Sequence, residues 1–420
     1  MLLVSLTSLA LTTSIITASG TIECCPPETQ DGQVIVQIGN DPRVQYAPES
    51  EVVEQVTIDV VFVLDTTGSM GGLIEGAKQK IWSIANEIAL AKPTPIVRMG
   101  LIGYRDRGDE YVIRGTELTD DLDTIYSKLM SFEANGGGDT PESVNEALFN
   151  AVERFDWSED NDALKLIFLV GDAPPQMGYE DDVKYRASCK IATEKGIFVN
   201  TIQCGSLAGT QEIWQEIAQI SNGSYAAIEQ SGGVQRISTP YDDQINEIDK
   251  QIRATMIDYG DSKVLEYQFG KRALSSTIVA ESSSDASADR AVYNQSAAGR
   301  ANYYGLQELV LDYSEKRVEL ESIEKEHLPE ELQSLSVDEL KEEVESRLSQ
   351  RDQLSTQLAD LAKQRSDFIA KEQIRLGVGG FDLKVVETLR EQGASKGIEI
   401  GKDSPDDEPT ESRKESKKDD

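Results

Sequence analysis

The amino-acid sequence predicts an α/β fold built on a doubly wound, mostly parallel sheet. Apolar runs rich in β-branched residues, such as Val56–Leu64 and Leu164–Val170, are nearly continuous, which is typical of strands buried on both faces of a parallel sheet. Helical patterns of ten or more residues alternate with these runs, as a doubly wound arrangement requires. A purely helical pattern in the C-terminal part predicts an additional α-helical hairpin or coiled coil.

The predicted elements follow one another in a regular order. The first strand leads into a helix with isoleucines at three- and four-residue spacing, which Pro93 ends. Two strands, Val97–Tyr104 and Tyr111–Leu118, are joined by only six residues, so they are expected to pair as an antiparallel hairpin. The remaining helices and strands are expected at residues 121–132, 141–155, 164–170, 181–195, 196–203, 211–220, 224–228 and 242–259.

Oxygen-bearing side chains cluster where the first strand ends. Asp65, Thr67 and Ser69 stand at alternate positions, and Gly68 permits a tight turn between them. In an open α/β sheet such a loop lies at the carboxyl end of a strand, where ligands bind. One carboxylate and two hydroxyls carry too little charge for a calcium cage and offer zinc no thiolate or imidazole, so Mg²⁺ or Mn²⁺ fits better. The same residue types are also ordinary helix caps, and by itself the motif leaves both interpretations open.

Two later loops supply matching residues. Thr140 precedes Pro141 in the glycine-rich stretch 136–142, and the second buried strand ends in Gly171-Asp172. Together with Asp65-x-Thr67-x-Ser69, these loops resemble the metal-ion-dependent adhesion site of von Willebrand factor A domains. The order along the chain is that of the family, with one threonine where many members have serine, which keeps the hydroxyl. The resemblance covers about Val56 to Tyr259, half of the chain.

This resemblance implies a site and a fold. It implies a Rossmann-like sheet with one antiparallel edge strand, and the metal ligands Asp65, Thr67, Ser69, Thr140 and Asp172. In the family the ion, here Mg²⁺ or Mn²⁺, keeps an open position that water or an acidic residue of a protein partner fills. The stretch Gly223–Ile228 also resembles the end of bacterial members.

The composition of the chain argues against several classes of function. The chain has 75 Asp and Glu against 41 Lys and Arg, a formal net charge of −34, so nucleic acid is not an expected partner. No nucleotide-binding glycine motif follows a strand. The single histidine, His327, excludes both a histidine-based triad and a histidine metal cluster. Enzymatic activity is therefore not expected.

The N-terminus predicts export to the periplasm, the cell surface or the extracellular space. Residues 1–20 resemble a signal peptide, since Leu2–Ser19 is uncharged and apolar and Ala18-Ser19-Gly20 offers a cleavage site. The stretch lacks a basic beginning, and an uncleaved membrane anchor is the alternative. Residues 21–55 are expected to be irregular apart from a short strand at Gln33–Gly39. In an exported chain Cys189 and Cys204 form either a disulfide or two buried free thiols.

Residues 56–259 are thus expected to be the α/β domain. The residues after it are not expected to belong to the sheet. Residues 260–300 are expected to be a linker, because Ser275–Ala298 is rich in serine, alanine and aspartate and has no hydrophobic period. A short helical segment is expected at residues 376–401, with its helix near Asp382–Gln392, and residues 402–420 form a charged tail predicted to be disordered.

Residues 301–375 predict two heptad helices joined at Pro329, and the second helix opens with a capping box from Ser336 to Glu339. The predicted seam consists of Leu306, Leu309, Tyr313, Leu320, Ile323 and His327 in the first helix, and of Val337, Leu340, Val344, Leu354, Leu358, Leu361 and Phe368 in the second. Arg347, Arg351 and Arg365 interrupt this seam; they are either solvated or set the register and the choice of partner. Self-association through residues 301–375 is the corresponding partner prediction.

Three functional hypotheses follow. The first is an exported adhesion or complex-assembly module whose metal ion coordinates an acidic group of a protein partner. The second is an envelope scaffold that acts through its coiled coil. The third is a metal-dependent phosphate hydrolase, which has only carboxylates such as Asp106 or Asp139 as candidate bases and lacks a second metal cluster.

Overall fold

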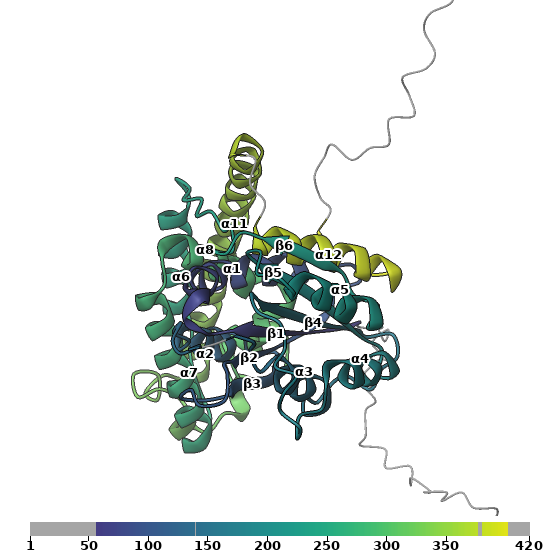
Figure 1. The fold of residues 1–420 in the computed structure, drawn as a ribbon. Helices are drawn as coiled ribbons and strands as arrows, with labels where there is room; N and C mark the ends of the chain where they lie inside the picture. Colours follow the sequence, from purple (N-terminus) through teal and green to yellow (C-terminus); the bar gives the residue numbers. More distant parts are fainter. Residues whose placement is uncertain (1–55, 139, 377–379, 402–420) are drawn as a thin grey trace, which may run out of the picture. The chain divides into compact units, whose positions relative to one another are not determined.

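A six-stranded sheet with the strand order β3-β2-β1-β4-β5-β6 carries the N-terminal half (Figure 1). The computed structural model describes residues 56–138, 140–376 and 380–401, which all belong to one compact unit. Neighbouring strands are parallel except for β2 and β3, which pair antiparallel at the edge, so the predicted fold class is confirmed. The strands are β1 (Thr57–Asp65), β2 (Ile96–Tyr104), β3 (Ile113–Thr119), β4 (Leu164–Gly171), β5 (Ile197–Cys204) and β6 (Tyr225–Ile228).

The burial of β1 on both of its faces explains why its apolar run is continuous. Ile58, Val60, Phe62 and Leu64 enter the hydrophobic core on one face of the sheet, and Val61 and Val63 enter the core on the other face. Because helices pack on both faces of the sheet, an alternating pattern would place polar side chains of β1 in one of the two cores.

The two faces carry different helices. Helices α3 (Val144–Glu153), α4 (Tyr185–Glu194) and α5 (Thr210–Ile220) cover one face, and α1 (Gly71–Ala89) and α2 (Leu122–Met130) cover the other. Cys189 on α4 belongs to the first core, whereas Cys204 at the end of β5 belongs to the second. The sheet therefore separates the two cysteines, and both are buried free thiols.

Helix α12 (Phe381–Ser395) comes from the far end of the chain and completes the α1 face of the sheet (Figure 1). The Phe381 ring lies 6.1 Å from the ring of Phe62 on β1. The side-chain amides of Asn200 on β5 and Gln392 on α12 exchange two buried hydrogen bonds of 2.9 and 2.7 Å. The short helix predicted near residues 382–392 is confirmed, and it is part of the sheet's own core.

The predicted linker at residues 260–300 is wrong. Helix α6 (Asp242–Ala254) is followed by α7 (Ser262–Glu281), α8 (Ser284–Gln295) and α9 (Ala297–Tyr304). Nine of the twelve residues of α8 are buried, because the helix packs against α1, α6, α9 and α11. A helix buried on all sides shows no amphipathic period, and small residues allow its close packing. The polar residues of α8 that suggested a linker make buried ion pairs: Arg290 with Asp123, and Asp289 with Arg365.

The predicted helical hairpin at residues 301–375 is also wrong. Its first arm consists of the end of α9, the short α10 (Leu309–Ser314) and two 3-10 turns, η2 (Leu320–Ser322) and η3 (Lys325–His327). The backbone leaves the helical region at Gly305 and at Lys316, which have φ values of 84° and 58°. The apolar residues of this arm divide between two clusters. Leu309, Leu320 and Leu328 pack with Leu340 and Val344, whereas Tyr304 and Leu311 pack with Leu354 and Leu358. His327 lies at the end of η3 and is 37% exposed.

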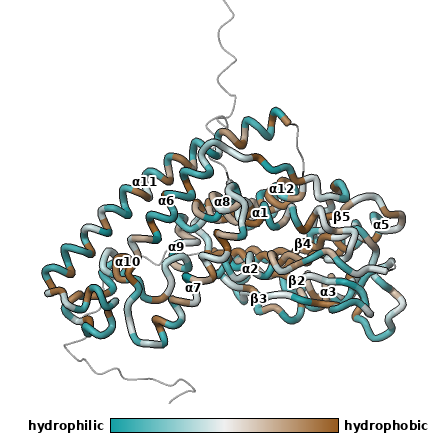
Figure 2. Tube along the Cα trace, turned by 90° about the vertical axis from the view of Figure 1, so that its left-hand side faces the viewer, coloured by the Kyte–Doolittle hydropathy of each residue, from teal (hydrophilic) through white to brown (hydrophobic). Residues whose placement is uncertain are grey.

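The second arm is a single helix of 40 residues, α11 (Val337–Leu376), which lies beside α6 (Figure 2). The predicted capping box is present, because Ser336 Oγ accepts from the amide of Glu339 while the Glu339 carboxylate accepts from the amide of Ser336 at 2.8 Å. Within residues 56–138, 140–376 and 380–401, every helix, including α11, is too short or too polar to cross a bilayer.

The seam of α11 is occupied inside this chain. Its buried residues are Leu340, Val344, Arg351, Leu354, Leu358 and Arg365. Arg351 makes a bidentate pair with Glu308 at 2.8 and 3.1 Å, and Arg365 pairs with Asp242 and Asp289. The arginines that interrupt the heptad thus dock α11 on its own chain, and self-association through residues 301–375 stays an untested prediction. The predicted signal peptide, the segment 21–55 and the tail 402–420 lie outside the described residues.

Arg351→Ala should lower the free energy of unfolding by about 3–5 kcal/mol, because it leaves the Glu308 carboxylate buried without a cation. Arg375→Ala on the same helix is the control; its side chain is 65% exposed and pairs only with Glu372, so its effect should stay within about 0.5 kcal/mol. Urea denaturation of the full chain measures both values. Equal effects of the two substitutions would show that the Arg351 pair does not dock α11.

Candidate metal centre

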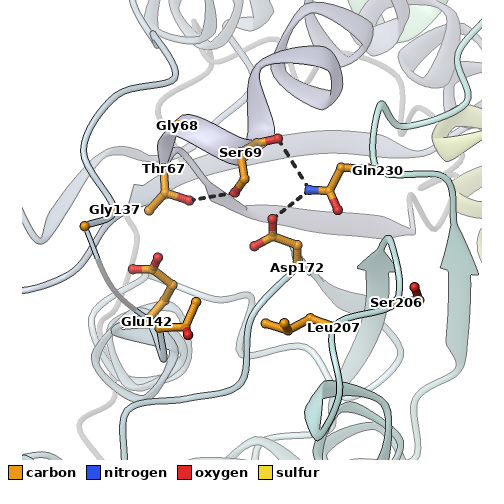
Figure 3. Close-up of a pocket in the computed structure, with 11 residues that line it drawn as sticks. Thr67, Gly68, Ser69, Gly137, Glu142, Asp172, Ser206, Leu207 and Gln230 are labelled. Atoms are coloured by element: carbon orange, nitrogen blue, oxygen red, sulfur yellow. Dashed lines mark hydrogen bonds between the residues drawn. The ribbon is translucent and has the colours of Figure 1, made fainter.

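A pocket of about 670 Å³ opens at the carboxyl ends of the parallel strands (Figure 3). Because β1, β4, β5 and β6 run parallel, the loops that follow them meet at one edge of the sheet. Thr67 and Ser69 come from the loop after β1, Asp172 from the loop after β4, and Gln230 from the segment after β6. Thr140 and Glu142 enter from the glycine-rich loop before α3.

The Asp65 carboxylate lies beneath this pocket with 0% exposure. One of its oxygens, Oδ1, accepts from the amide of Thr67 at 2.8 Å and from the Thr67 hydroxyl at 2.6 Å. The Thr67 hydroxyl lies 3.4 Å from the Ser69 hydroxyl, so the three predicted ligands of this loop form one connected group. The other carboxylate oxygen, Oδ2, is buried and has no hydrogen-bond partner in the part of the chain that the structure describes.

The glycine-rich loop approaches Thr67 closely. The Gly136 carbonyl accepts from the amide of Gly68 at 3.2 Å. Gly137 has a φ of 73°, and a Cβ atom there would lie 2.8 Å from the Cβ of Thr67. A side chain at position 137 would therefore be strained and would collide with the β1 loop. The glycine allows the Thr140 loop to come within reach of the Asp65 loop.

Glu142 is a second buried carboxylate at the pocket. It is 3% exposed, and none of the described residues forms a hydrogen bond with its Oε2 atom. Its backbone is held from the other side, because its amide donates to the Pro174 carbonyl at 3.0 Å and its carbonyl accepts from the Gln176 amide at 2.7 Å. The loop that carries Thr140 is thereby fixed to the loop that carries Asp172.

Asp172 faces the pocket from the β4 side and is half-buried. Its Oδ2 atom accepts a 2.6 Å hydrogen bond from the side-chain amide of Gln230, which also donates to the Ser69 carbonyl at 3.4 Å (Figure 3). Gln230 thus connects the loops after β1 and β4, and it leaves the rest of the Asp172 carboxylate open to the pocket.

Burial and mutual repulsion raise the pKa values of the two inner carboxyls. The pKa of Asp65 is raised to about 7, mainly by burial, although its hydrogen bonds from Thr67 oppose this effect. The pKa of Glu142 is raised to about 8 by burial and then by the charges of Asp65, Asp106, Asp109 and Asp172. No Lys or Arg is among the described residues that line the pocket, so these groups have no cation there to balance them.

The donor set fits a hard divalent cation. It consists of carboxylate and hydroxyl oxygens, with two buried carboxylate oxygens that no protein group satisfies. Mg²⁺ and Mn²⁺ prefer oxygen ligands, and Mg²⁺ is usually held by one or two carboxylates together with water. Asp65, Thr67, Ser69, Thr140 and Asp172 are the residues that would hold such an ion, with Glu142 beside them.

The predicted ligands lie close together, but Asp65 is more deeply buried than the other four. Thr67, Ser69, Thr140 and Asp172 line the pocket directly, whereas Asp65 lies below and is connected to it through Thr67. Helix α3 begins at Val144 and not at Pro141, so Thr140 stands in the loop. Asp106, a candidate base for a hydrolase, does not line the pocket; it accepts from the hydroxyls of Ser143 at 2.7 Å and Tyr179 at 2.8 Å. Asp139, the other candidate base, lies outside the described residues.

Sequence reasoning missed Glu142, Gln230, Ser206 and Leu207, which also line the pocket. A signal for three of them was available, because Ser206, Leu207 and Gln230 follow the ends of β5 and β6 at the same edge of the sheet. Glu142 stands two residues after Thr140 in the same loop, but the sequence does not show that its side chain turns inward.

Comparison with known proteins finds a match for the α/β part. Residues 59–240 match the model of the von Willebrand factor A domain. A putative ariadne-like RING finger protein of Acanthamoeba polyphaga mimivirus is 28% identical over 121 residues, which are 29% of this chain and 11% of that protein. The von Willebrand factor A domain-containing protein 7 of Rattus norvegicus is 36% identical over 115 residues, which are 27% of this chain and 12% of that protein. The aligned segments thus span about a tenth of the length of these two relatives.

Among solved structures, the conserved hypothetical protein BatB from Bacteroides thetaiotaomicron is 19% identical, with a TM-score of 0.31. The match covers 41% of this chain and 90% of that one. The match to the von Willebrand factor A domain thus rests on the sequence of residues 59–240, which contain most of the six-stranded sheet.

Proposed function

We propose that this chain binds a divalent cation, Mg²⁺ or Mn²⁺, through Asp65, Thr67, Ser69, Thr140 and Asp172, and uses it to coordinate an acidic group of a protein partner. The observation that carries the proposal is the pair of buried carboxylate oxygens, Asp65 Oδ2 and Glu142 Oε2, which have no hydrogen-bond partner and no lysine or arginine beside them in the pocket lining. A dication would offset the cost of burying these charges without a counter-charge.

The exposure of the ligands supports a partner-binding role. Ser69 and Thr140 are exposed and Asp172 is half-buried, whereas Asp65 and Thr67 are buried. An ion held by these groups would rest on the Asp65 side and face solvent on the other side. A carboxylate from a partner is the chemically matching ligand for that open side, because hard divalent ions prefer oxygen anions.

The two alternative functions have less support. A coiled-coil scaffold needs a free apolar seam, and the seam of α11 is buried within the chain. A phosphate hydrolase needs a base that faces the pocket, and Asp106 is held elsewhere by Ser143 and Tyr179. Export is part of the proposal and rests on the apolar stretch Leu2–Ser19, which lies outside the described residues.

The first test is titration calorimetry of the metal-free full chain with Mg²⁺ and Mn²⁺. The wild-type chain should bind one ion, and Asp65→Asn and Asp172→Asn should each weaken binding by at least about tenfold, because each removes a carboxylate from the site. Asp367→Asn, an exposed carboxylate on α11, should bind like the wild type. Ionic strength must be constant, since the chain carries a net charge of −34. Unchanged binding in both site variants would rule out this metal centre.

Glu142→Gln keeps the shape of the side chain and removes its charge. It should weaken Mn²⁺ binding by roughly tenfold at about pH 9, where the wild-type carboxyl is ionised, and by less at about pH 6, where that carboxyl is protonated because its pKa is raised to about 8. Calorimetry at the two pH values measures the difference. An effect of the same size at both values would mean that Glu142 acts through shape alone.

Without metal, stability should fall as pH rises from about 5 to about 8. The pKa of Asp65 is about 7 and that of Glu142 about 8 in the folded chain, above the ordinary values near 4, so the native state keeps protons that the unfolded chain has released. This contribution is complete below the ordinary values and is lost as pH passes the raised values. The Asp65→Asn variant has no titratable group at position 65, so its stability should fall less as pH rises.

Urea denaturation in EDTA at these two pH values tests the prediction, with Asp367→Asn as the control that should fall like the wild type. If Asp65→Asn falls as steeply as the wild type, the inner carboxyl is not protonated in the metal-free fold.

A further inference from the structure

One apolar side chain stands on the otherwise polar wall of the pocket. Leu207, from the loop between β5 and α5, lines the pocket and is 44% exposed (Figure 3). Every other described lining residue is a serine, threonine, glycine, glutamine or carboxylate residue. A partner group that reaches the metal site therefore meets a single hydrophobic surface, on the Asp172 side.

The position of Leu207 is fixed by the elements around the site. Its carbonyl accepts from the amide of Thr210 at 3.3 Å, and the Thr210 hydroxyl donates to the carbonyl of Asp172 at 3.3 Å. At the start of the same loop, the Gly205 amide donates to the Ile228 carbonyl of β6 at 2.9 Å. Leu207 is therefore held at a constant place relative to Asp172, as a specificity contact must be.

The charge around the pocket limits what else a partner can carry. Asp172 and Glu142 line the pocket, Asp65 lies below it, and no Lys or Arg is among its described lining residues. The two arginines of the neighbouring β2–β3 loop are already paired: Arg105 donates to the carbonyls of Thr66 and Glu133, and Arg107 pairs with Asp181 and Asp182. A second anionic group on a partner would find no cation here and would be repelled by these carboxylates.

We propose that the partner presents a single carboxylate next to an aliphatic side chain, which packs on Leu207, and that polyacidic segments are excluded. This inference rests on the proposed function, because the bound ion holds the carboxylate. Contact between the aliphatic group and Leu207 removes apolar surface of both from water, which favours such a partner over one with a polar neighbour. The carboxylates of the pocket repel a second carboxylate on the partner.

Four immobilised peptides test the inference: Gly-Asp-Leu-Gly, Gly-Asp-Ser-Gly, Gly-Asp-Asp-Gly and Gly-Asn-Leu-Gly, each with blocked ends. The full chain in Mn²⁺ at constant ionic strength should bind the Asp-Leu peptide roughly fivefold to tenfold more tightly than the Asp-Ser peptide, and the Asp-Asp peptide more weakly still. The Asn-Leu peptide should not bind, because it lacks the carboxylate.

Two substitutions of Leu207 test whether this side chain causes the preference for the Asp-Leu peptide. Leu207→Ser should make the Asp-Leu and Asp-Ser peptides equal while leaving Mn²⁺ binding unchanged, and Leu207→Met should restore the preference. Leu90→Ser is the matched control, because Leu90 is 64% exposed and follows the C-terminal end of the 19-residue helix α1. This helix is about 28 Å long, and its other end follows the Thr67–Ser69 loop.

The outcomes separate the two proposals. Equal binding of the Asp-Leu and Asp-Ser peptides by the wild-type chain, tighter binding of the Asp-Asp peptide, or a preference that survives Leu207→Ser would overturn the inference and leave metal-dependent carboxylate binding intact. If none of the peptides binds in Mn²⁺, the proposed function fails and this inference fails with it.

Discussion

The carboxylate of Asp65, buried at the end of the central strand, is the group on which the arrangement of the site depends. It holds the turn of Thr67 through one oxygen, and its other oxygen has no hydrogen-bond partner among the described residues. Burying an unpaired charge is costly, and the raised pKa of Asp65, about 7, shows that cost in the metal-free chain. The glycine-rich loop, Glu142 and the Gln230 side chain line the same pocket, so the stability of three loops is connected to what occupies the site.

The helical half of the molecule is fixed by buried arginine–carboxylate pairs. Arg290 on α8 reaches Asp123 on α2, and Arg365 on α11 reaches Asp242 on α6 and Asp289 on α8. Such pairs contribute little net stability but specify geometry, because a misplaced helix would leave a buried charge alone. The same acidic composition that gives the chain its large negative charge thus supplies both the metal-binding oxygens and the carboxylates that orient the helices.

The sequence predicts the sheet and the convergence of the loops at its edge because both depend on local patterns, and the metal ligands themselves stay a prediction. Continuous β-branched runs mark strands buried on both faces, and parallel strands bring their terminal residues to one edge, so Thr67, Ser69, Thr140 and Asp172 were predicted to converge and do converge. The helical half was predicted poorly for the opposite reason. Helix α8 is buried on every side and has no period, and the apolar residues of 309–332 keep a heptad-like spacing although they fold into a compact cap. Glu142 could not be recognised, because its inward direction depends on backbone bonds to Pro174 and Gln176.

The position of α12 has a consequence for how this chain is made. Phe381 packs on Phe62 of the first strand, and Arg390 pairs with Glu87 across 303 residues of sequence. While the chain is synthesised from its N-terminus, the sheet is complete long before α12 exists, and the part of the α1 face that α12 covers stays exposed during that time. Contacts between residues so distant in sequence form slowly, and exposed apolar surface favours aggregation until they form. A nascent chain that ends before residue 381 would therefore need a chaperone, or its own acidic surface, to stay in solution.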